Sequence, residues 1–258
     1  MEISHILIAI VGSFIAGGIN TLAGNGSAIT LTILTEILGL PPNLANGTNR
    51  VGVVGQSAAS TYAFYRHDKL DWQHSKFYII LMVIGAVIGT FIATWVSNDQ
   101  FKAVFRFLMI FMLLIILVKP SRWLRETDPN YSLPRWITIP AFLGLGFYGG
   151  FIQMGMGIFF LAIMVLGARY SLTDANVVKS LVVGIYTTVA VIIFHFYHQI
   201  HWGYGLIMAA GQMGGGYLAA HFASKYPSAN LWAHRLLVVM IIVSIFLLFD
   251  LEQYVWPA

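Results

Sequence analysis

The chain has 258 residues, of which 58% are hydrophobic and only 9% carry a charge. Soluble domains carry about 25% charged residues, so this composition excludes a soluble globular protein. The net charge of +4 needs no nucleic-acid partner, because a bias of Lys and Arg toward cytoplasmic loops explains it. The chain contains no cysteine, which excludes disulfides and thiolate chemistry.

Five uncharged apolar runs approach or reach the roughly 20 residues that cross a bilayer. They are 5–23, 77–96, 136–153, 180–199 and 202–224. The first run lacks a basic N-terminal region and a small-residue cleavage site, so we expect it to be a permanent element, not a removed signal peptide. The sequence therefore predicts an all-α polytopic membrane protein.

In chain order, the predicted helices are 5–22, 27–39, 46–65, 73–97, 100–118, 136–152, 157–168, 173–198, 203–224 and 229–250. The second and seventh are short, about 12 residues each, and each follows a Gly-rich break, a pattern typical of repeated transporter halves. A shift of 130 residues aligns 43–72 with 173–202 without a gap and pairs Asn46 with Asn176. We therefore predict an N-terminal repeat over 1–119, a cytoplasmic linker over 120–135 and a C-terminal repeat over 136–258.

The distribution of basic residues selects a topology through the positive-inside rule. If all ten segments reverse the chain, eleven of the 14 basic residues face one side, and only Arg50, Lys102 and Arg106 face the other. If each break lies inside one continuous span, the split is seven to seven. Five elements per half is an odd number, so the two halves are predicted to be inverted, with both termini on the non-cytoplasmic side. Whether the Gly-rich pairs are re-entrant or full spans stays open.

The first polar break is Gly24-Asn25-Gly26-Ser27, and Gly157 lies in the matching break of the second half. Irregular backbone survives in hydrocarbon only where protein or a water-filled cavity surrounds it, and such breaks hold substrates in secondary transporters. Free N–H groups and the positive dipole at a helix start favour an anion. We therefore predict that these residues bind substrate. The alternative is that the glycines only permit close helix packing.

A second polar cluster, "ANGTNR", is predicted to begin a helix, with Asn46 or Thr48 as its N-cap and Arg50 one turn inside. Lys179 occupies the position of Asn49 in the other half. A cation at the bilayer centre costs at least about 2.5–3.5 kcal/mol, so it indicates function. Two cations at nearly equivalent positions predict a small-anion site that also includes Asn46, Thr48 and Asn49. The alternative is that both cations reach the headgroups.

Three uncharged amides, Gln56, Gln153 and Gln212, lie inside apolar segments. Each is a candidate donor to the oxygens of a bound oxyanion. Each could equally bond a neighbouring helix, since interhelical amide hydrogen bonds are common in membranes.

Two further features have weaker interpretations. His195, His198 and His201 recur every third residue, a spacing that can hold a metal. They end a helix beside Trp202 with no carboxylate, so we predict no metal and no cofactor. Glu36 is a candidate proton-coupling carboxylate, or it faces water near the end of its short helix.

The first half contains "SFIAGGINTLAGNGSAITL", "LGLPPNLANGTNR" and "HDKLDW", and the second contains "GFYGGFIQMGMGIFF", "DANVVKS" and "HQIHW". Together these stretches resemble the sulfite exporter TauE/SafE-like permeases over nearly the whole chain, more weakly in the second half. The resemblance implies export, or less often uptake, of sulfite, sulfonates or related small anions across the bacterial inner membrane. Asn25 and Ser27 replace glycines of the family pattern, and Arg50 stands where Lys is usual, which leaves the exact substrate open.

The main prediction is a secondary transporter that exports sulfite, sulfoacetate or a related anion by alternating access, with proton coupling as an option. A passive channel, which would need a continuous polar pore, and an importer of a related anion are the alternatives. The sequence has no G-x-x-x-x-G-K-[ST] loop, and Ser27 has no assignable His partner, so we expect neither an ATPase nor an enzyme. The expected partners are a small anion and the lipid bilayer, with a homodimer as an option.

Overall fold

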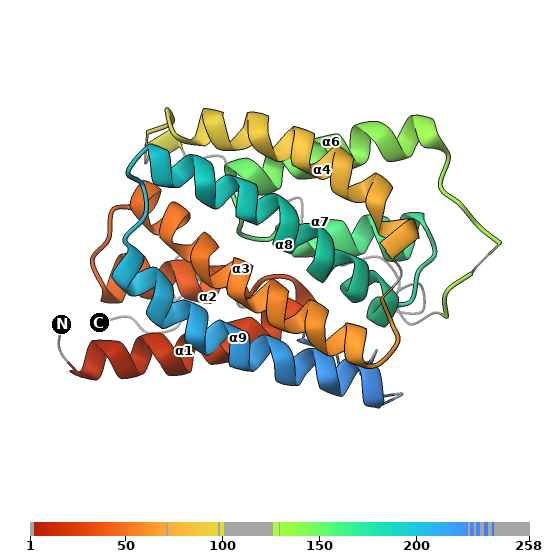
Figure 1. Cartoon of the computed structure of the whole chain (residues 1–258), viewed down its shortest axis with the longest axis horizontal. Helices are drawn as coiled ribbons and strands as arrows, with labels where there is room; N and C mark the ends of the chain where they lie inside the picture. Colours follow the sequence, from red (N-terminus) through yellow and green to blue (C-terminus); the bar gives the residue numbers. More distant parts are fainter. Residues whose placement is uncertain are drawn as a thin grey trace, which may run out of the picture.

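The computed structural model describes residues 3–70, 72–97, 99–100, 126–128, 130–226, 228–229, 231–232, 235–236 and 239. Apart from isolated positions, the predicted helices 100–118 and 229–250 lie outside the described residues, as do residues 120–125 and 129 of the predicted linker. Within the described part, every regular element is helical (Figure 1). The all-α prediction is confirmed for these residues.

The first half begins with helix α1 (Ile3–Ala23), which ends at the first polar break. The short helix α2 (Gly26–Thr32) then continues directly into the π-helical segment η1 (Ile33–Ile37). Two long helices follow, α3 (Pro42–Arg66) and α4 (Trp72–Ala93).

The second half repeats this order. Helix α6 (Arg135–Phe151) leads to the second break, then to α7 (Met156–Leu161) and the π-helical segment η3 (Ala162–Gly167). The long helices α8 (Leu172–Phe196) and α9 (Trp202–Lys225) complete it. The first residues of α7, α8 and α9 each lie 130 positions after the first residues of α2, α3 and α4, the same shift that aligned the sequence.

The start of α3 differs from its predicted start. The helix begins at Pro42, with Pro41 as its N-cap residue, so the prediction of Asn46 or Thr48 as N-cap was wrong. Proline is favoured in the first helical turn, because its φ is already helical and its missing N–H would have had no partner there. Arg50 therefore lies two turns inside the helix instead of one.

The two breaks turn the chain back toward the end from which it came. The hairpin of α1 with α2 and η1 opens at the end of the bundle that also holds loop 197–201, which we call the α1 end (Figure 1). The hairpin of α6 with α7 and η3 opens at the opposite end, beside loop 67–70 and residues 126–134, which we call the linker end. The two hairpins thus enter the bundle from opposite ends.

Glycines let the long helices pack closely in two pairs, α1 with α9 and α4 with α6. A Cβ on Gly17 would lie 2.7 Å from the Cα of Gln212, and a Cβ on Gly150 would lie 2.6 Å from the Cα of Ala86. Small residues at such crossings are the usual basis of helix association in membranes. Helix α3 packs between α8 and α9 and so connects the halves.

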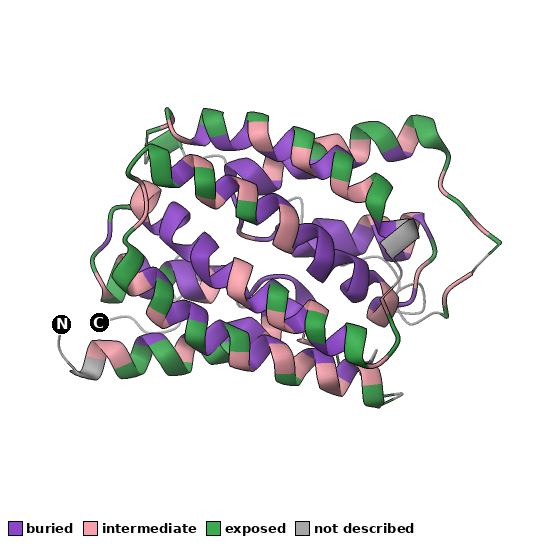
Figure 2. Ribbon diagram, in the orientation of Figure 1, coloured by how far each residue is buried: buried purple, intermediate pink, exposed green. Residues whose placement is uncertain are grey.

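The outward faces of the bundle are apolar. Figure 2 shows buried residues concentrated along the centre and exposed residues on the outer faces of α1, α4 and α9. The exposed side chains include Leu7, Val11, Ile15, Ile80, Ile84, Ile88, Leu206 and Leu218. Among the described residues, α1, α4 and α8 contain stretches long and apolar enough to cross a membrane. An apolar exterior around a polar centre suits lipid as the solvent.

Candidate functional site

The two breaks meet at the centre of the molecule. A Cβ on Gly157 would lie 2.5 Å from the Cα of Gly24, and a Cβ on Gly24 would lie 2.7 Å from the Cα of Gly157. Gly24 also has φ +83°, a conformation that favours glycine. The two backbone segments are therefore in direct contact, and no ligand fits between them.

Lys179 and Asn176 of α8 cap the end of α1. The Lys179 ammonium donates to the carbonyl oxygens of Asn20 (2.8 Å) and Thr21 (3.0 Å) and to Asn176 Oδ1 (2.5 Å). Asn176 Nδ2 donates to the Leu22 carbonyl at 3.0 Å. The last carbonyls of a helix have no partner within it, and a cation there also complements the negative dipole end. These two residues of the second half therefore provide hydrogen-bond donors for the carbonyl groups at the break of the first half.

Arg50 and Asn46 of α3 do the same for α6. The Arg50 guanidinium donates to the carbonyl oxygens of Gly149 (2.8 Å) and Gly150 (2.7 Å), and Asn46 Nδ2 donates to the Phe151 carbonyl at 3.2 Å. The three carbonyls lie 129 positions after those that the α8 pair caps. Each half thus caps the break of the other half.

Both cations are deeply buried, Arg50 with 0% and Lys179 with 3% of its surface exposed. The alternative that they reach the headgroups does not fit these positions. The Lys179 ammonium has three N–H donors, and each of them has an acceptor, so its hydrogen bonds are complete. Arg50 retains one N–H, at Nε, without a partner in the described structure.

A polar network joins α1 to α3 next to the first break. Gln56 Oε1 accepts from Asn20 Nδ2 at 2.6 Å, and Gln56 Nε2 donates to Thr21 Oγ1 at 2.8 Å. The hydroxyls of Thr21 and Ser60 are 2.9 Å apart. Gln56 therefore bonds a neighbouring helix, as one of its two interpretations predicted.

Gln153 lies in the second break and links three elements. Its Oε1 accepts from the Arg50 guanidinium at 3.2 Å, and its Nε2 lies 3.2 Å from the hydroxyl oxygen of Tyr186 on α8. The Arg50 guanidinium also lies 4.9 Å from the centre of the Phe194 ring. Gln153 thus connects the cation of one half to a long helix of the other.

Four of the predicted residues border one small internal cavity of about 10 Å³. The cavity is lined by Asn20, Gln56, Ser57, Gln153, Met156, Gly157, Lys179, Ser180 and Val183. Such a volume holds about one water molecule, so a sulfite-sized anion requires the surrounding side chains to move. The cavity lies between the two breaks and receives residues from both halves.

The other predicted residues lie around this centre. Asn49 Oδ1 accepts from the Thr30 hydroxyl at 2.5 Å, and Thr48 Oγ1 accepts from the His201 N–H at 2.9 Å. Gln212 packs against Gly52, where a Cβ would meet its side chain. None of these three borders the central cavity.

The first break itself is fully internal. Asn25 and Ser27 have 0% and 3% of their surface exposed. A Cβ on Gly26 would clash with the carbonyl oxygen of Ala16 on α1. Gly26 therefore has a packing role in the hairpin. A larger residue at this position would disturb that packing as well as any contact with an anion.

Sequence reasoning missed Asn20, Asn176, Ser57 and Ser180. The 130-residue shift pairs Asn176 with Asn46, so the sequence did contain a signal for the role of Asn176. The hydroxyls of Ser57 and Ser180 border the cavity, are buried and have no partner in the described structure. Nothing in the sequence separates them from serines that only pack between helices.

The histidines and Glu36 have other roles. His195 Nδ1 accepts from the Trp202 indole at 3.3 Å, and His201 Nδ1 accepts from the Tyr204 N–H at 3.2 Å, which caps α9. Within the described residues, no group of three His, Asp or Glu side chains could hold a metal. Glu36 is exposed at the end of η1.

Comparison with known proteins agrees with these features. The profile of the family described as "Sulfite exporter TauE/SafE" matches residues 9–248. A probable membrane transporter protein, ORF9, from Sinorhizobium sp. is 29% identical over 236 residues, covering 91% of this chain and 87% of the relative. A probable membrane transporter protein from Haemophilus influenzae is 27% identical over 223 residues, covering 85% and 86%. No solved structure matches the chain significantly. The chain is a multi-pass membrane protein that belongs to the sulfite exporter TauE/SafE family.

Proposed function

We propose that this protein is a secondary transporter that exports small sulfur-containing or organic anions, of the sulfite or sulfonate class, by alternating access. One observation carries this proposal. Arg50 and Lys179 are buried at the centre, and within the described residues no Asp or Glu side chain is buried to balance them. Buried charges are costly unless they are paired, and removing two cations from water costs several kcal/mol each. An anion would supply the missing charge.

In this proposal the anion binds beside the contact of the two breaks. Lys179 exchanges one of its two helix-end carbonyls for an oxygen of the substrate. Asn176 keeps its hydrogen bond to the Leu22 carbonyl. The hydroxyls of Ser57 and Ser180 and the amides of Gln56 and Gln153 donate to the remaining oxygens. Charge-assisted hydrogen bonds of this kind are about twice as strong as neutral ones.

The remaining predicted residues support the site from outside. Gly24 permits the close approach of the two hairpins, and Gly26 permits the packing of α2 against α1 within the first hairpin. Asn46 and Asn49 hold Arg50 and α2 in place. Asn25, Ser27, Thr48 and Gln212 complete the polar surroundings from the first half and α9.

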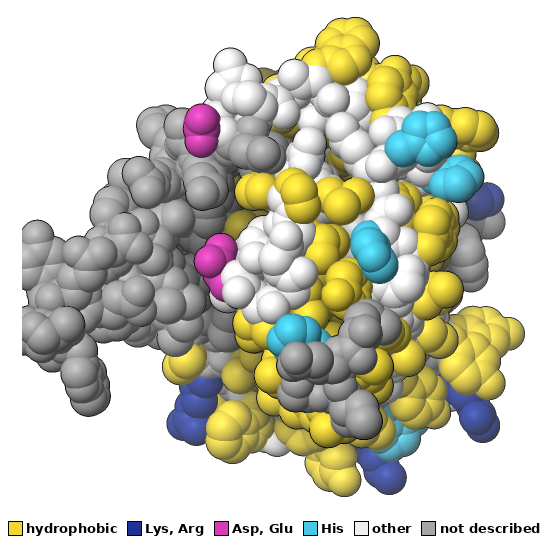
Figure 3. Space-filling view, turned by 90° about the vertical axis from the view of Figure 1, so that its left-hand side faces the viewer, with side chains coloured by type: hydrophobic (Ala, Val, Ile, Leu, Met, Phe, Trp, Pro, Cys, Tyr) yellow, Lys and Arg dark blue, Asp and Glu magenta, His cyan; other side chains and the backbone are white. Residues whose placement is uncertain are grey.

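We further propose that the halves 1–119 and 136–258 are inverted repeats and that the linker end faces the cytoplasm. At the linker end, basic residues lie at the ends of α3, η3 and α9 and at the start of α6, namely Arg66, Lys69, Arg135, Arg169 and Lys225. The described loops of the α1 end, 38–41, 94–97 and 197–201, contain no Lys or Arg. Figure 3, viewed from the α1 end, shows His side chains here and Lys and Arg only at the margin. The positive-inside rule then places the termini outside the cytoplasm of a bacterial inner membrane.

The function is tested by flux in proteoliposomes. Purified protein is reconstituted, and uptake of sulfite, sulfoacetate, taurine and sulfate is measured with and without a pH gradient. We expect saturable uptake of sulfite or a sulfonate, and exchange against the same anion loaded inside. Uptake that never saturates would indicate a channel, and no flux of any of these anions would contradict the proposed substrate class.

Arg50 is expected to set anion affinity. Arg50→Gln removes the buried charge and the Nε–H, the one guanidinium donor without a partner in the described structure. A charge-assisted hydrogen bond from this donor to the anion would be worth roughly 1.5–3 kcal/mol, so affinity should fall about tenfold or more. Arg50→Lys should be intermediate, because the charge stays and the two-pronged geometry is lost. The concentration dependence of flux gives both values. If both variants fold and transport normally, Arg50 only caps α6.

A further inference from the structure

The two ends of the bundle differ at positions that the 130-residue shift makes equivalent. At the α1 end, loop 197–201 is closed onto the first turns of α3. The His201 N–H donates to Thr48 Oγ1 at 2.9 Å, and Gln199 Nε2 donates to the Thr94 carbonyl at 3.3 Å. The Gln199 carbonyl oxygen lies so close to Gly47 that a Cβ on this glycine would clash with it. This end of the α3–α9 interface is sealed.

At the linker end the equivalent parts border a cavity instead. Lys69 is the equivalent of Gln199, and Val177 and Val178 are the equivalents of Gly47 and Thr48. All three line one cavity of about 440 Å³. The contact that closes the α1 end therefore has an open counterpart at the linker end.

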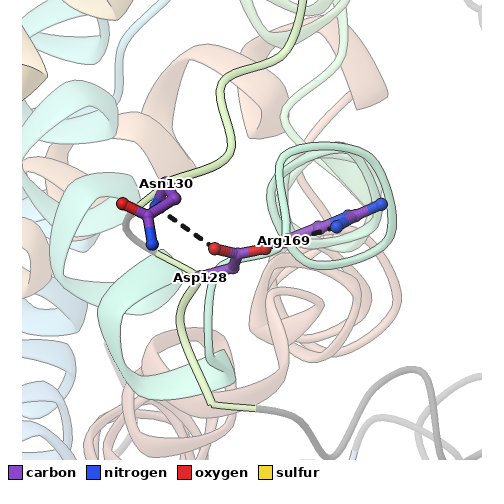
Figure 4. A network of polar contacts seen from close by, with 3 residues as sticks. All are labelled: Asp128, Asn130 and Arg169. Atoms are coloured by element: carbon purple, nitrogen blue, oxygen red, sulfur yellow. Dashed lines mark hydrogen bonds and ion pairs between the residues drawn. The ribbon is translucent and has the colours of Figure 1, made fainter.

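The linker provides the outer wall of this cavity through a surface contact. The Arg169 guanidinium lies 3.3 Å from the Asp128 carboxylate, which also accepts from the Asn130 N–H at 3.1 Å (Figure 4). Arg169 also lies 4.0 Å from the centre of the Tyr131 ring. The ion pair is half-exposed, with 47% and 38% of the two side chains accessible. Exposed pairs contribute about 0–1 kcal/mol, so the wall is held mainly by hydrogen bonds: the Thr127 hydroxyl donates to the Asp174 carboxylate, and the Asp128 N–H donates to the Arg169 carbonyl at 3.1 Å.

A second hollow lies on the outer face of the bundle and extends from the linker end toward the centre. A groove of about 560 Å³ lies between α3 and α8 and runs from Tyr65 and Leu70 to Ser57 and Gly184. Ser57 borders both this groove and the small central cavity. Its hydroxyl is buried and has no partner within the described residues. Ser57 thus lies between the groove and the central cavity.

We propose that the structure is the state whose central site is reached from the linker end, with Ser57 at the inner mouth of the path. The contacts of Thr48 with His201 and of Gly47 with Gln199 form the gate that seals the α1 end. In the opposite state this gate opens, and loop 67–70 closes over Val177 and Val178. The assignment rests on the proposed transport function. The opposite state needs no new fold, because each half then adopts the packing that the other half has in this structure.

Cysteine accessibility tests the path. The chain has no cysteine, so single Cys variants are labelled without background. Ser57→Cys and Thr187→Cys form a matched pair, because the two positions are 130 residues apart and both hydroxyls are buried without a partner in the described structure. Arg66→Cys and Ser97→Cys, both exposed, mark the linker end and the α1 end.

A membrane-impermeant thiol reagent is applied to sealed vesicles of either orientation, without any anion. We expect Ser57→Cys to react from the side that labels Arg66→Cys. The rate from the other side should be at least about tenfold lower, because access from there requires the opposite state, which is populated below a tenth. Thr187→Cys should react slowly from both sides. Equal reaction of Ser57→Cys from both sides, or reaction from the Ser97→Cys side, would overturn the proposal.

The gate is tested by Thr48→Val, which removes the acceptor of the His201 N–H. Thr187→Cys should then react several-fold faster from the α1 end, and Ser57→Cys more slowly from the linker end. Gly47→Ala should act in the same direction, because its Cβ would displace the Gln199 carbonyl. Thr32→Val is the control, since that exposed hydroxyl bonds only within α2, to Ala28. Unchanged ratios in both folded gate variants would refute the gate, whereas the absence of anion flux in the parent protein, measured separately, would refute the proposed transport function.

Discussion

Replacing Lys179 with Met is expected to abolish anion transport while the protein still folds. The variant leaves the buried Thr21 carbonyl without its donor, at about 1–3 kcal/mol, whereas the Asn20 carbonyl keeps the Gly24 N–H at 3.1 Å. It also removes a buried charge that no acidic side chain among the described residues balances, and the desolvation penalty of one such ion is several kcal/mol. The two effects oppose each other, so the net loss of stability should not exceed about 3 kcal/mol.

Thermal unfolding in detergent and flux in proteoliposomes separate these effects. Lys225→Met is the control, because Lys225 ends α9 and is exposed. It should leave both quantities unchanged. If Lys179→Met transports sulfite or a sulfonate with the affinity of the parent protein, Lys179 only caps α1 and the anion binds elsewhere.

Gly157→Ala is expected to block transport by separating the two breaks. The new Cβ would lie 2.5 Å from the Cα of Gly24, so backbone must move. Overpacking of this kind costs about 1–3 kcal/mol, and more where only backbone can yield. Because Gly157 also borders the central cavity, the displacement changes the site directly.

Gly144→Ala is the matched control for this substitution. Gly144 lies inside α6, and a Cβ there would meet nothing within 4 Å. Alanine is the better helix former, so stability should rise by about 0.5–1 kcal/mol with transport unchanged. Equal effects of the two variants on flux would show that the contact of the breaks is not required for transport.

The sequence predicts the architecture well because the physical signals are local. Apolar runs of bilayer length, interrupted by Gly-rich breaks, predict the described helices of both halves. The 130-residue shift predicts the spacing at which α7, α8 and α9 begin. The wrong N-cap of α3 has a local cause as well, since Pro41-Pro42 favours an earlier start than Asn46.

The centre is harder to predict because its contacts join distant segments. Lys179 and Asn20 are 159 positions apart, and Arg50 and Gly149 are 99 apart. The sequence identifies the two cations as intramembrane charges but cannot show that each caps the break of the other half. Ser57 and Ser180 gain their position only from the crossing of α3 and α8, which no local pattern encodes.

The most direct test of the account is a structure determined with selenite, an electron-rich analogue of sulfite, in the site. We expect its anomalous signal beside the contact of Gly24 and Gly157, within about 4 Å of Lys179 Nζ, the range in which an opposite charge interacts strongly. At least one of the carbonyls of Asn20 and Thr21 should have moved away from that ammonium. Selenite bound only outside the bundle, with Lys179 still on both carbonyls, would contradict the account.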